Sequence, residues 1–223
     1  MARIAVVGSY GVGMTMRVPR MVEAGETLVA ASFDVGPGGK GSNQAIGASR
    51  LGATADLLTC VGPDEFGRAA RGRWEEERVG AGKVRTGTRP TMVGLILVEP
   101  GGENRIVIAP GALDELSPAD VRRFRSEIAR ADLCAVVLEI PLETALAALR
   151  MAREVGTPTL LNPAPAVPLP ADAWPSIDYL TPNRGEASRL VDGAAGDPEG
   201  AVAALRQRFG GTIVLTLGSE GAI

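Results

Sequence analysis

The sequence predicts an α/β fold, in which a doubly wound, mostly parallel sheet carries helices on both faces and a smaller β sheet lies beside it. Short apolar runs that end in glycine or a polar residue recur along the 223 residues, as buried parallel strands do. Amphipathic stretches alternate with these runs, which is typical of strand–helix–strand units. Two β-rich segments, residues 14–37 and 84–110, break the alternation, and we expect them to form the smaller sheet. Residues 1–223 are expected to make one domain.

The first half of the chain opens with a predicted strand at residues 4–8. The glycines at 8–13 follow it, but their spacing is not Gly-x-Gly-x-x-Gly and no helical pattern comes next. An NAD-linked dehydrogenase would rest on these glycines alone. Met14, Met16 and Val18 then alternate with polar residues, as in a strand. The later elements are a helix at 43–51, a strand at 55–62, a helix at 65–80 and a hairpin of 93–99 with 105–109.

The second half of the chain is more regular. Ser117 and Pro118 form an N-cap and N1 pair that begins a helix, and apolar residues at helical spacing continue it to residue 128. The remaining predicted elements are strands at 133–139, 157–161, 177–180 and 212–217, and helices at 142–155, 186–190 and 201–209. Residues 219–223 resemble a turn leading into a further strand, so we expect a fragment or a truncated product.

Composition excludes several classes of function. The net charge is −3 and the pI about 5.2, so the chain lacks the basic surface that nucleic acid or an acidic membrane would need. No signal segment opens the chain and no apolar run is long enough to cross a bilayer, so we expect a soluble, cytoplasmic protein. Cys60 and Cys134 have apolar neighbours and are expected to be buried free thiols.

The absence of histidine limits the chemistry further. It removes Ser-His-Asp and Cys-His catalysis and every histidine-ligated metal site. Catalysis must therefore depend on carboxylates, lysine, backbone amides or a metal held by oxygen.

The most informative motif is a glycine-rich turn that opens onto a helix. It reads Gly36-Pro37-Gly38-Gly39-Lys40-Gly41-Ser42-Asn43 and contains one of only two lysines. Glycines let the backbone approach a ligand closely, and the start of a helix presents free N–H groups. Such a place suits a polyhydroxyl or anionic ligand.

Further polar groups follow the predicted strands, where ligands bind in open α/β sheets. Glu139 could accept hydrogen bonds from sugar hydroxyls or could cap a helix. Asn183 and Glu186 could face a hydrated cation or phosphate, or form a capping box. Residues 216–221 could cradle phosphates or make a hairpin turn, and no Walker-type phosphate loop occurs.

The order of these motifs resembles that of the ribokinase family of carbohydrate kinases, of PfkB type, over essentially the whole chain. The motifs are Gly-Gly-Lys-Gly-Ser-Asn-Gln, Leu-Glu before a proline, Asn-Pro-Ala-Pro-Ala, Thr-Pro-Asn-x-x-Glu and Thr-Leu-Gly-Ser-x-Gly. The resemblance implies a ribokinase-like three-layer fold with a β lid formed by 14–37 and 84–110. It also implies phosphorylation of a sugar hydroxyl with ATP and Mg²⁺. The Asn-Pro-Ala-Pro-Ala loop is most like that of the ribose-phosphorylating members, which indicates conversion of D-ribose to ribose 5-phosphate.

The resemblance also implies roles for individual residues. The sugar hydroxyls would be bound by Gly39, Lys40, Gly41, Ser42, Asn43 and Glu139. ATP would be bound by Asn183, Thr216, Leu217, Gly218, Ser219, Glu220 and Gly221. Glu186 would act on Mg²⁺ through water, and a monovalent cation stays open as a further cofactor. Lid closure would exclude water, and the lid would pair with that of a second copy in a homodimer.

Two departures from the family pattern stand out. Gly11 and Gly13 occupy the positions at which ribokinase-like members carry a sugar-binding Asn and Asp. The family's catalytic aspartate lies in a Gly-Ala-Gly-Asp motif that this sequence does not contain, so we expect the 223-residue chain to be inactive alone. Two alternatives stay open, namely a non-catalytic sugar- or nucleotide-binding protein on the same scaffold and a nucleoside kinase.

Overall fold

A seven-stranded parallel sheet forms the centre of the computed structural model, which describes residues 1–191 and 198–223. Its order across the sheet is β13 (Thr212–Ile213), β12 (Tyr179–Leu180), β11 (Thr159–Asn162), β10 (Leu133–Val137), β1 (Arg3–Val7), β4 (Thr54–Leu58) and β6 (Val79–Gly80). Every paired strand runs parallel to its neighbour. The chain winds from β1 through β4 to β6 in one direction and from β10 to β13 in the other. The predicted doubly wound sheet is therefore confirmed.

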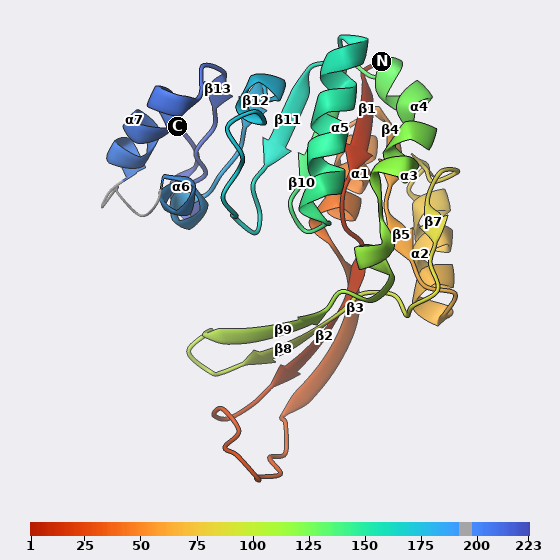
Figure 1. Cartoon of the computed structure of the whole chain (residues 1–223). Helices are drawn as coiled ribbons and strands as arrows, with labels where there is room; N and C mark the ends of the chain where they lie inside the picture. The colour runs from red at the N-terminus through yellow and green to blue at the C-terminus, as the bar shows by residue number, and fades with distance from the viewer. Residues whose placement is uncertain (192–197) are drawn as a thin grey trace.

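Helices cover both faces of this sheet (Figure 1). One face carries α1 (Lys40–Arg50) and α2 (Glu65–Glu76); the other carries α3 (Pro118–Arg123), α4 (Arg125–Ala129), α5 (Leu142–Val155), α6 (Arg184–Leu190) and α7 (Pro198–Arg208). The alternation along β1 produces this arrangement, because Ala5 and Val7 belong to one apolar cluster and Val6 to the other. Trp74 of α2 and Phe124, between α3 and α4, are the largest side chains buried in the two clusters.

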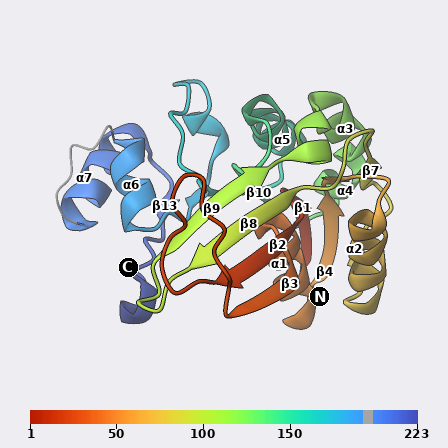
Figure 2. The same cartoon turned by 90° about the horizontal axis from the view of Figure 1, so that it is seen from below.

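A separate four-stranded sheet extends from the carboxyl ends of the central strands (Figures 1 and 2). Its order is β3 (Ser32–Gly38), β2 (Gly11–Arg17), β8 (Val93–Val98) and β9 (Asn104–Ala109). The two outer pairs are antiparallel, and β2 and β8 run parallel in the middle. The two β-rich segments of the sequence thus contribute two strands each, and residues 18–31 between β2 and β3 are not in strands.

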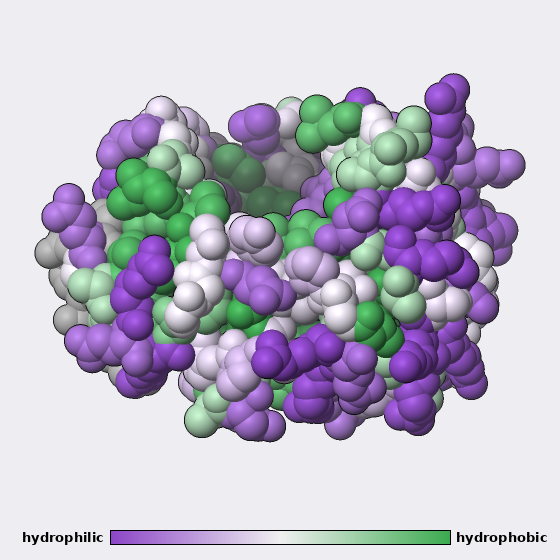
Figure 3. Space-filling view, turned by 90° about the horizontal axis from the view of Figure 1, so that it is seen from above, coloured by the Kyte–Doolittle hydropathy of each residue, from purple (hydrophilic) through white to green (hydrophobic). Residues whose placement is uncertain are grey.

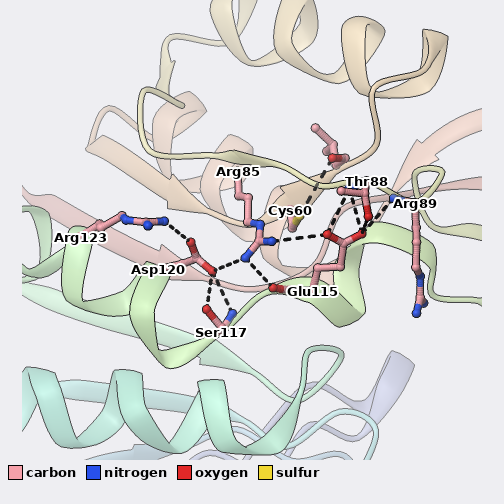
Figure 4. Close-up of polar contacts among 9 residues, drawn as sticks. Cys60, Arg85, Thr88, Arg89, Glu115, Ser117, Asp120 and Arg123 are labelled. Carbon is pink, nitrogen blue, oxygen red and sulfur yellow. Dashed lines mark hydrogen bonds and ion pairs between the residues drawn. The ribbon is translucent and has the colours of Figure 1, made fainter.

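Ion pairs and hydrogen bonds hold the connection into β8 (Figure 4). This connection begins at the short pair β5 (Cys60–Val61) and β7 (Arg85–Thr86). The Arg85 guanidinium donates to the Glu115 carbonyl at 2.9 Å and to Asp120 Oδ2 at 3.2 Å. The Glu115 carboxylate, at the end of the 3-10 helix Gly111–Glu115, accepts the N–H groups of Thr88 and Arg89. The segment that enters the second sheet is therefore fixed to the segment that leaves it.

Several boundaries differ from the sequence-based prediction. Helix α1 begins at Lys40 rather than at residue 43, because Gly39 is its N-cap with φ of 92°. Helix α2 ends at Glu76, before Arg78 turns to φ of 57°. The strand predicted at 55–62 divides at Thr59 into β4 and β5, which pair with different strands. The helix after Ser117 divides at Phe124, and the last strand shortens to Thr212–Ile213.

The remaining surface and core features agree with an ordinary globular interior. Cys60 and Cys134 are buried free thiols, as predicted, and burial raises the pKa of Cys134 to about 12. Seen from the amino ends of the strands, apolar residues gather in the part of the molecule that contains α6, α7 and β13 (Figure 3). No helix within the described ranges is both long enough and apolar enough to cross a bilayer.

Candidate functional site

Polar side chains meet where β1 and β10 end. Ser9 follows β1, Glu139 follows β10, and Lys40 begins α1. The two strands are neighbours, yet the chain winds away from them in opposite directions. In open α/β sheets, the crevice at the carboxyl ends of two such strands is where ligands bind.

The Glu139 carboxylate joins these three elements. It accepts hydrogen bonds from the Ser9 hydroxyl, from the Lys40 N–H at 2.9 Å and from the Lys40 ammonium group. Burial by itself would raise the pKa of Glu139, but the hydrogen bonds from Lys40 and Ser9 lower it below its ordinary value. The site therefore holds a charged, half-buried acceptor beside a charged donor at the start of a helix. Adjacent hydroxyls of a sugar need this combination of donor and acceptor.

Glycines allow α1 to approach the β1–β2 turn this closely. A Cβ atom at Gly39 would lie 2.6 Å from Tyr10 Cα, and one at Gly41 would lie 2.6 Å from Gly8 Cα. The backbone of Ser42 donates to the Ser9 carbonyl at 2.9 Å. The first turn of α1 is thus packed backbone to backbone, which the positive φ of Gly39 makes possible.

A cavity of about 350 Å³ opens beside the Lys40–Glu139 pair. Its charged lining residues are Lys40, Glu139 and Asp114. Its apolar lining residues come from β9, from the residues flanking the second sheet, and from the loops after β10 and β11; they are Met92, Ile108, Pro110, Leu138, Ile140, Pro141 and Pro165. A larger cavity of about 590 Å³, lined by Leu169, Trp174 and Arg208 among others, contains none of the predicted site residues.

Gly11 and Gly13 lie on β2, next to this cavity wall. A Cβ at Gly11 would lie 2.3 Å from Met92 Cε and 2.9 Å from the Met92 carbonyl oxygen, so the Met92 side chain fills that space. A Cβ at Gly13 would meet Ile96 Cδ1 at 3.5 Å, an ordinary contact. There is room for a side chain at residue 13 but not at residue 11.

A second group of predicted residues meets at the carboxyl ends of β12 and β13. Asn183 and Thr216 form a parallel bridge. Asn183 and Glu186 also form a capping box: Asn183 Oδ1 accepts the Glu186 N–H, and Glu186 Oε2 accepts the Asn183 N–H, both at 2.8 Å. Gly218–Glu220 is a 3-10 turn, and Glu220 pairs with Arg184 at 2.6 Å. In the described ranges no three Asp, Glu, Cys or His side chains lie together as a metal site would require.

The structure brings Gly39, Lys40, Gly41 and Glu139 together but sets Asn43 and Ser42 apart. Asn43 is exposed and lines a separate cavity of about 280 Å³ with Ile46 and Arg50. The Ser42 side chain is 2% exposed, and its hydroxyl accepts the Trp74 Nε1–H at 2.8 Å, so its side chain belongs to the core. Sequence reasoning missed Ser9, although a polar residue at the end of the first strand is itself an indication. It also missed the cavity role of Asp114, because no pattern in the sequence places this residue beside Glu139.

Comparison with known proteins gives consistent matches. The family model described as "pfkB family carbohydrate kinase" matches residues 1–223. The ribokinase of Haemophilus influenzae is 34% identical over 98% of this chain and 72% of its own length. The ribokinase of Schizosaccharomyces pombe is 36% identical over 100% of this chain and 74% of its own. The structure of Arabidopsis thaliana ribokinase with ribose and ATP superposes with a TM-score of 0.87 at 26% identity, over 100% of this chain and 74% of that one.

Proposed function

Because the chain belongs to the pfkB family of carbohydrate kinases, we propose that it serves the ATP-dependent phosphorylation of a sugar hydroxyl, with D-ribose as the sugar. The observation that carries this proposal is the Lys40–Glu139 pair beside a cavity at the switch point of the sheet. The name of the Arabidopsis complex, with ribose and ATP, supports the choice of both substrates.

In this proposal the sugar lies against the start of α1. Lys40 donates to sugar hydroxyls, Glu139 accepts from them, and the side-chain amide of Asn43 is a further donor and acceptor. Gly39 and Gly41 contribute by letting the start of α1 lie close to the β1–β2 turn, because the Gly41 N–H itself donates to Ser9 Oγ at 3.4 Å. Met92 and Ile108 supply an apolar wall, as the C–H face of a sugar ring needs. Room at Gly13 leaves space for a substituent or water on that side.

The nucleotide lies at the ends of β12 and β13, on Asn183 and residues 216–221. The N–H groups of Leu217, Glu220 and Gly221 donate to carbonyls within this turn, so we assign the phosphate contacts to the N–H groups of Gly218 and Ser219. Glu186 fits a hydrated Mg²⁺, because only Oε2 of its carboxylate takes part in the capping box. The magnesium ion would neutralise phosphate charge during transfer.

The second sheet acts as a lid in this proposal and pairs with that of another copy. The support is one face of the sheet, on which Phe33, Val35, Leu95 and Val107 are each at least 40% exposed. An apolar face of this kind is typical of an interface. Val107→Glu on β9 is expected to convert a dimer into a monomer in sedimentation experiments, whereas Glu103→Gln in the hairpin turn is expected to leave the dimer intact. A monomeric wild-type chain would contradict the dimer.

The experiment for the function is calorimetric titration of D-ribose and of a non-hydrolysable ATP analogue into the 223-residue chain. Binding of both supports the proposal, and binding of neither overturns it. Tighter binding of adenosine than of ribose would favour a nucleoside kinase. We propose that turnover is slow or absent, since no Gly-Ala-Gly-Asp sequence occurs in residues 1–223. Ribose-dependent ADP formation would contradict slow or absent turnover and would support the kinase activity. Binding of both ligands without ADP formation would agree equally with a non-catalytic binding protein.

A further inference from the structure

The Asp64 carboxylate holds Thr91, a residue that precedes the second sheet. Asp64 is the N-cap of α2, and its Oδ1 accepts the Gly67 N–H at 2.9 Å. The same carboxylate accepts the Thr91 N–H at 2.7 Å and the Thr91 hydroxyl at 2.6 Å. Thr91 is 2% exposed, and its hydroxyl accepts the Gly62 N–H at 2.9 Å. Both the backbone and the side chain of Thr91 are therefore fixed.

Glycines pack the surrounding loops against this residue. A Cβ at Gly62 would lie 2.4 Å from Thr91 N, and one at Gly111 would lie 2.0 Å from the Pro90 carbonyl oxygen. A Cβ at Gly67 would lie 2.2 Å from the Gly62 carbonyl oxygen. Residues 90–91 are thus enclosed between the loop before α2 and the loop after β9. Any displacement of these two residues would also move the backbone at Gly62 or Gly111.

Met92 follows Thr91 directly and belongs to the candidate sugar cavity. Its side chain lines that cavity together with Lys40 and Glu139. Its carbonyl accepts the Val12 N–H at 2.9 Å, which begins the pairing of β2 with β8. The next peptide after Thr91 therefore sets both one wall of the cavity and the junction of two strands of the second sheet.

We propose that Asp64 and Thr91 are positioning residues for sugar binding: the Asp64 carboxylate fixes Thr91, and Thr91 places Met92 against the sugar. This inference rests on the proposed sugar site. Neither Asp64 nor Thr91 lines the cavity, so their effect on the sugar passes through Met92. Nucleotide affinity should not depend on Asp64 or Thr91, because the Asn183–Thr216 group lies at the β12–β13 edge of the sheet, several strands away.

The chain offers a matched control in a second aspartate–threonine pair. Asp178 Oδ2 accepts the Thr159 N–H at 2.8 Å, and Thr159 is 1% exposed. The Thr159 hydroxyl lies 3.2 Å from the same oxygen and 2.8 Å from the Ser176 carbonyl oxygen, so its hydrogen is shared between two acceptors. This pair joins β11 and β12 where they begin, at the end of the sheet opposite to the cavity. Loss of either pair removes similar hydrogen bonds, so both should lower stability to a similar degree.

The test compares D-ribose affinity in Asp64→Asn and Thr91→Val with that in Asp178→Asn and Thr159→Val. The first two variants are expected to raise the Kd for ribose about tenfold with an unchanged Kd for the ATP analogue. The two controls should stay within about twofold of wild type for both ligands. Thr91→Ser keeps the hydroxyl and should restore the ribose affinity. Equal losses in both pairs, or lower melting temperatures with unchanged ribose affinity, would overturn the proposal.

A second readout does not depend on ribose binding. The ¹³C-methyl NMR resonance of Met92, assigned with Met92→Leu, should shift in Asp64→Asn and Thr91→Val but not in the Asp178 and Thr159 variants. If wild type fails to bind ribose while this resonance shifts as expected, the proposed sugar site is wrong and the positioning of Met92 stands. An unshifted Met92 resonance in Asp64→Asn would refute the positioning role.

Discussion

Replacement of Glu139 by glutamine is the most informative perturbation of the candidate site. Glutamine keeps the size of the side chain but removes the charge that Lys40, Ser9 and the first N–H of α1 share. Hydrogen bonds to a charged group contribute about 1.5–3 kcal/mol, against about 0.5–1.5 kcal/mol for neutral ones. A negative charge at a helix N-terminus adds about 0.3–1 kcal/mol.

The net loss of stability is smaller than the sum of these contributions. The Lys40 side chain is 43% exposed, so water compensates most of its lost ion pair. Glutamine can also still accept one of the backbone or hydroxyl hydrogen bonds. We therefore expect the free energy of unfolding to fall by about 1–2 kcal/mol, which lowers the melting temperature by roughly 2–8 °C.

The ribose affinity should fall further than the stability suggests, because the proposed acceptor for sugar hydroxyls is lost. Calorimetry should show a Kd for D-ribose raised by about tenfold or more, with the Kd for the ATP analogue unchanged. The control is Glu143→Gln, which removes an exposed carboxylate from the first turn of α5. If Glu139→Gln matches Glu143→Gln in both melting temperature and ribose affinity, the reasoning about this site is refuted.

Three further outcomes are expected. Gly41→Ala should destabilise the chain by about 3 kcal/mol or more in urea unfolding, because the new Cβ would meet backbone atoms. Gly47→Ala, whose Cβ would have nothing within 4 Å, should stabilise the chain by about 0.5–1 kcal/mol. Equal effects of the two substitutions would contradict the close packing of α1. The pKa of Glu139 is lowered, so its carboxylate stays charged at and above its ordinary pKa and becomes neutral only at lower pH. Ribose affinity measured by calorimetry should therefore be constant from pH 8 to about 5 and decline below about pH 4. A decline already at pH 6 would contradict this. Cys60 and Cys134 should not react with a thiol reagent at pH 8 in the folded chain. Burial raises the pKa of Cys60 to about 11 and that of Cys134 to about 12. Rapid labelling without unfolding would contradict their burial.

The sequence was sufficient to predict the central sheet, because its strands are apolar runs that only a sheet covered on both faces can bury. It predicted the ends of helices and strands less reliably. Helix α1 could be extended back to Lys40 only once the φ of Gly39 and its packing against Tyr10 were known. Thr59 ends β4 because the partner strand changes there, and that pairing depends on residues 85–86, far along the chain.

The candidate site was predictable where function and local structure coincide, and not elsewhere. Lys40 and Glu139 stand next to a glycine-rich helix start and at a strand end, which are features of sequence. Met92 and Asp64 reach their places through long-range contacts with residues 11–12 and 91. No spacing in the sequence records those contacts. The capping box of Asn183 and Glu186 likewise satisfies a structural need and leaves room for the proposed function, so sequence alone could not decide between the two.

A structure of the chain with D-ribose and an ATP analogue bound would test the central claim most directly. We predict the sugar in the cavity beside Lys40 and Glu139, with its hydroxyls on both side chains and Met92 against its ring. The nucleotide should lie at Asn183 and residues 216–221. Ribose found instead in the larger cavity beside Trp174, or contacting neither Lys40 nor Glu139, would contradict the account.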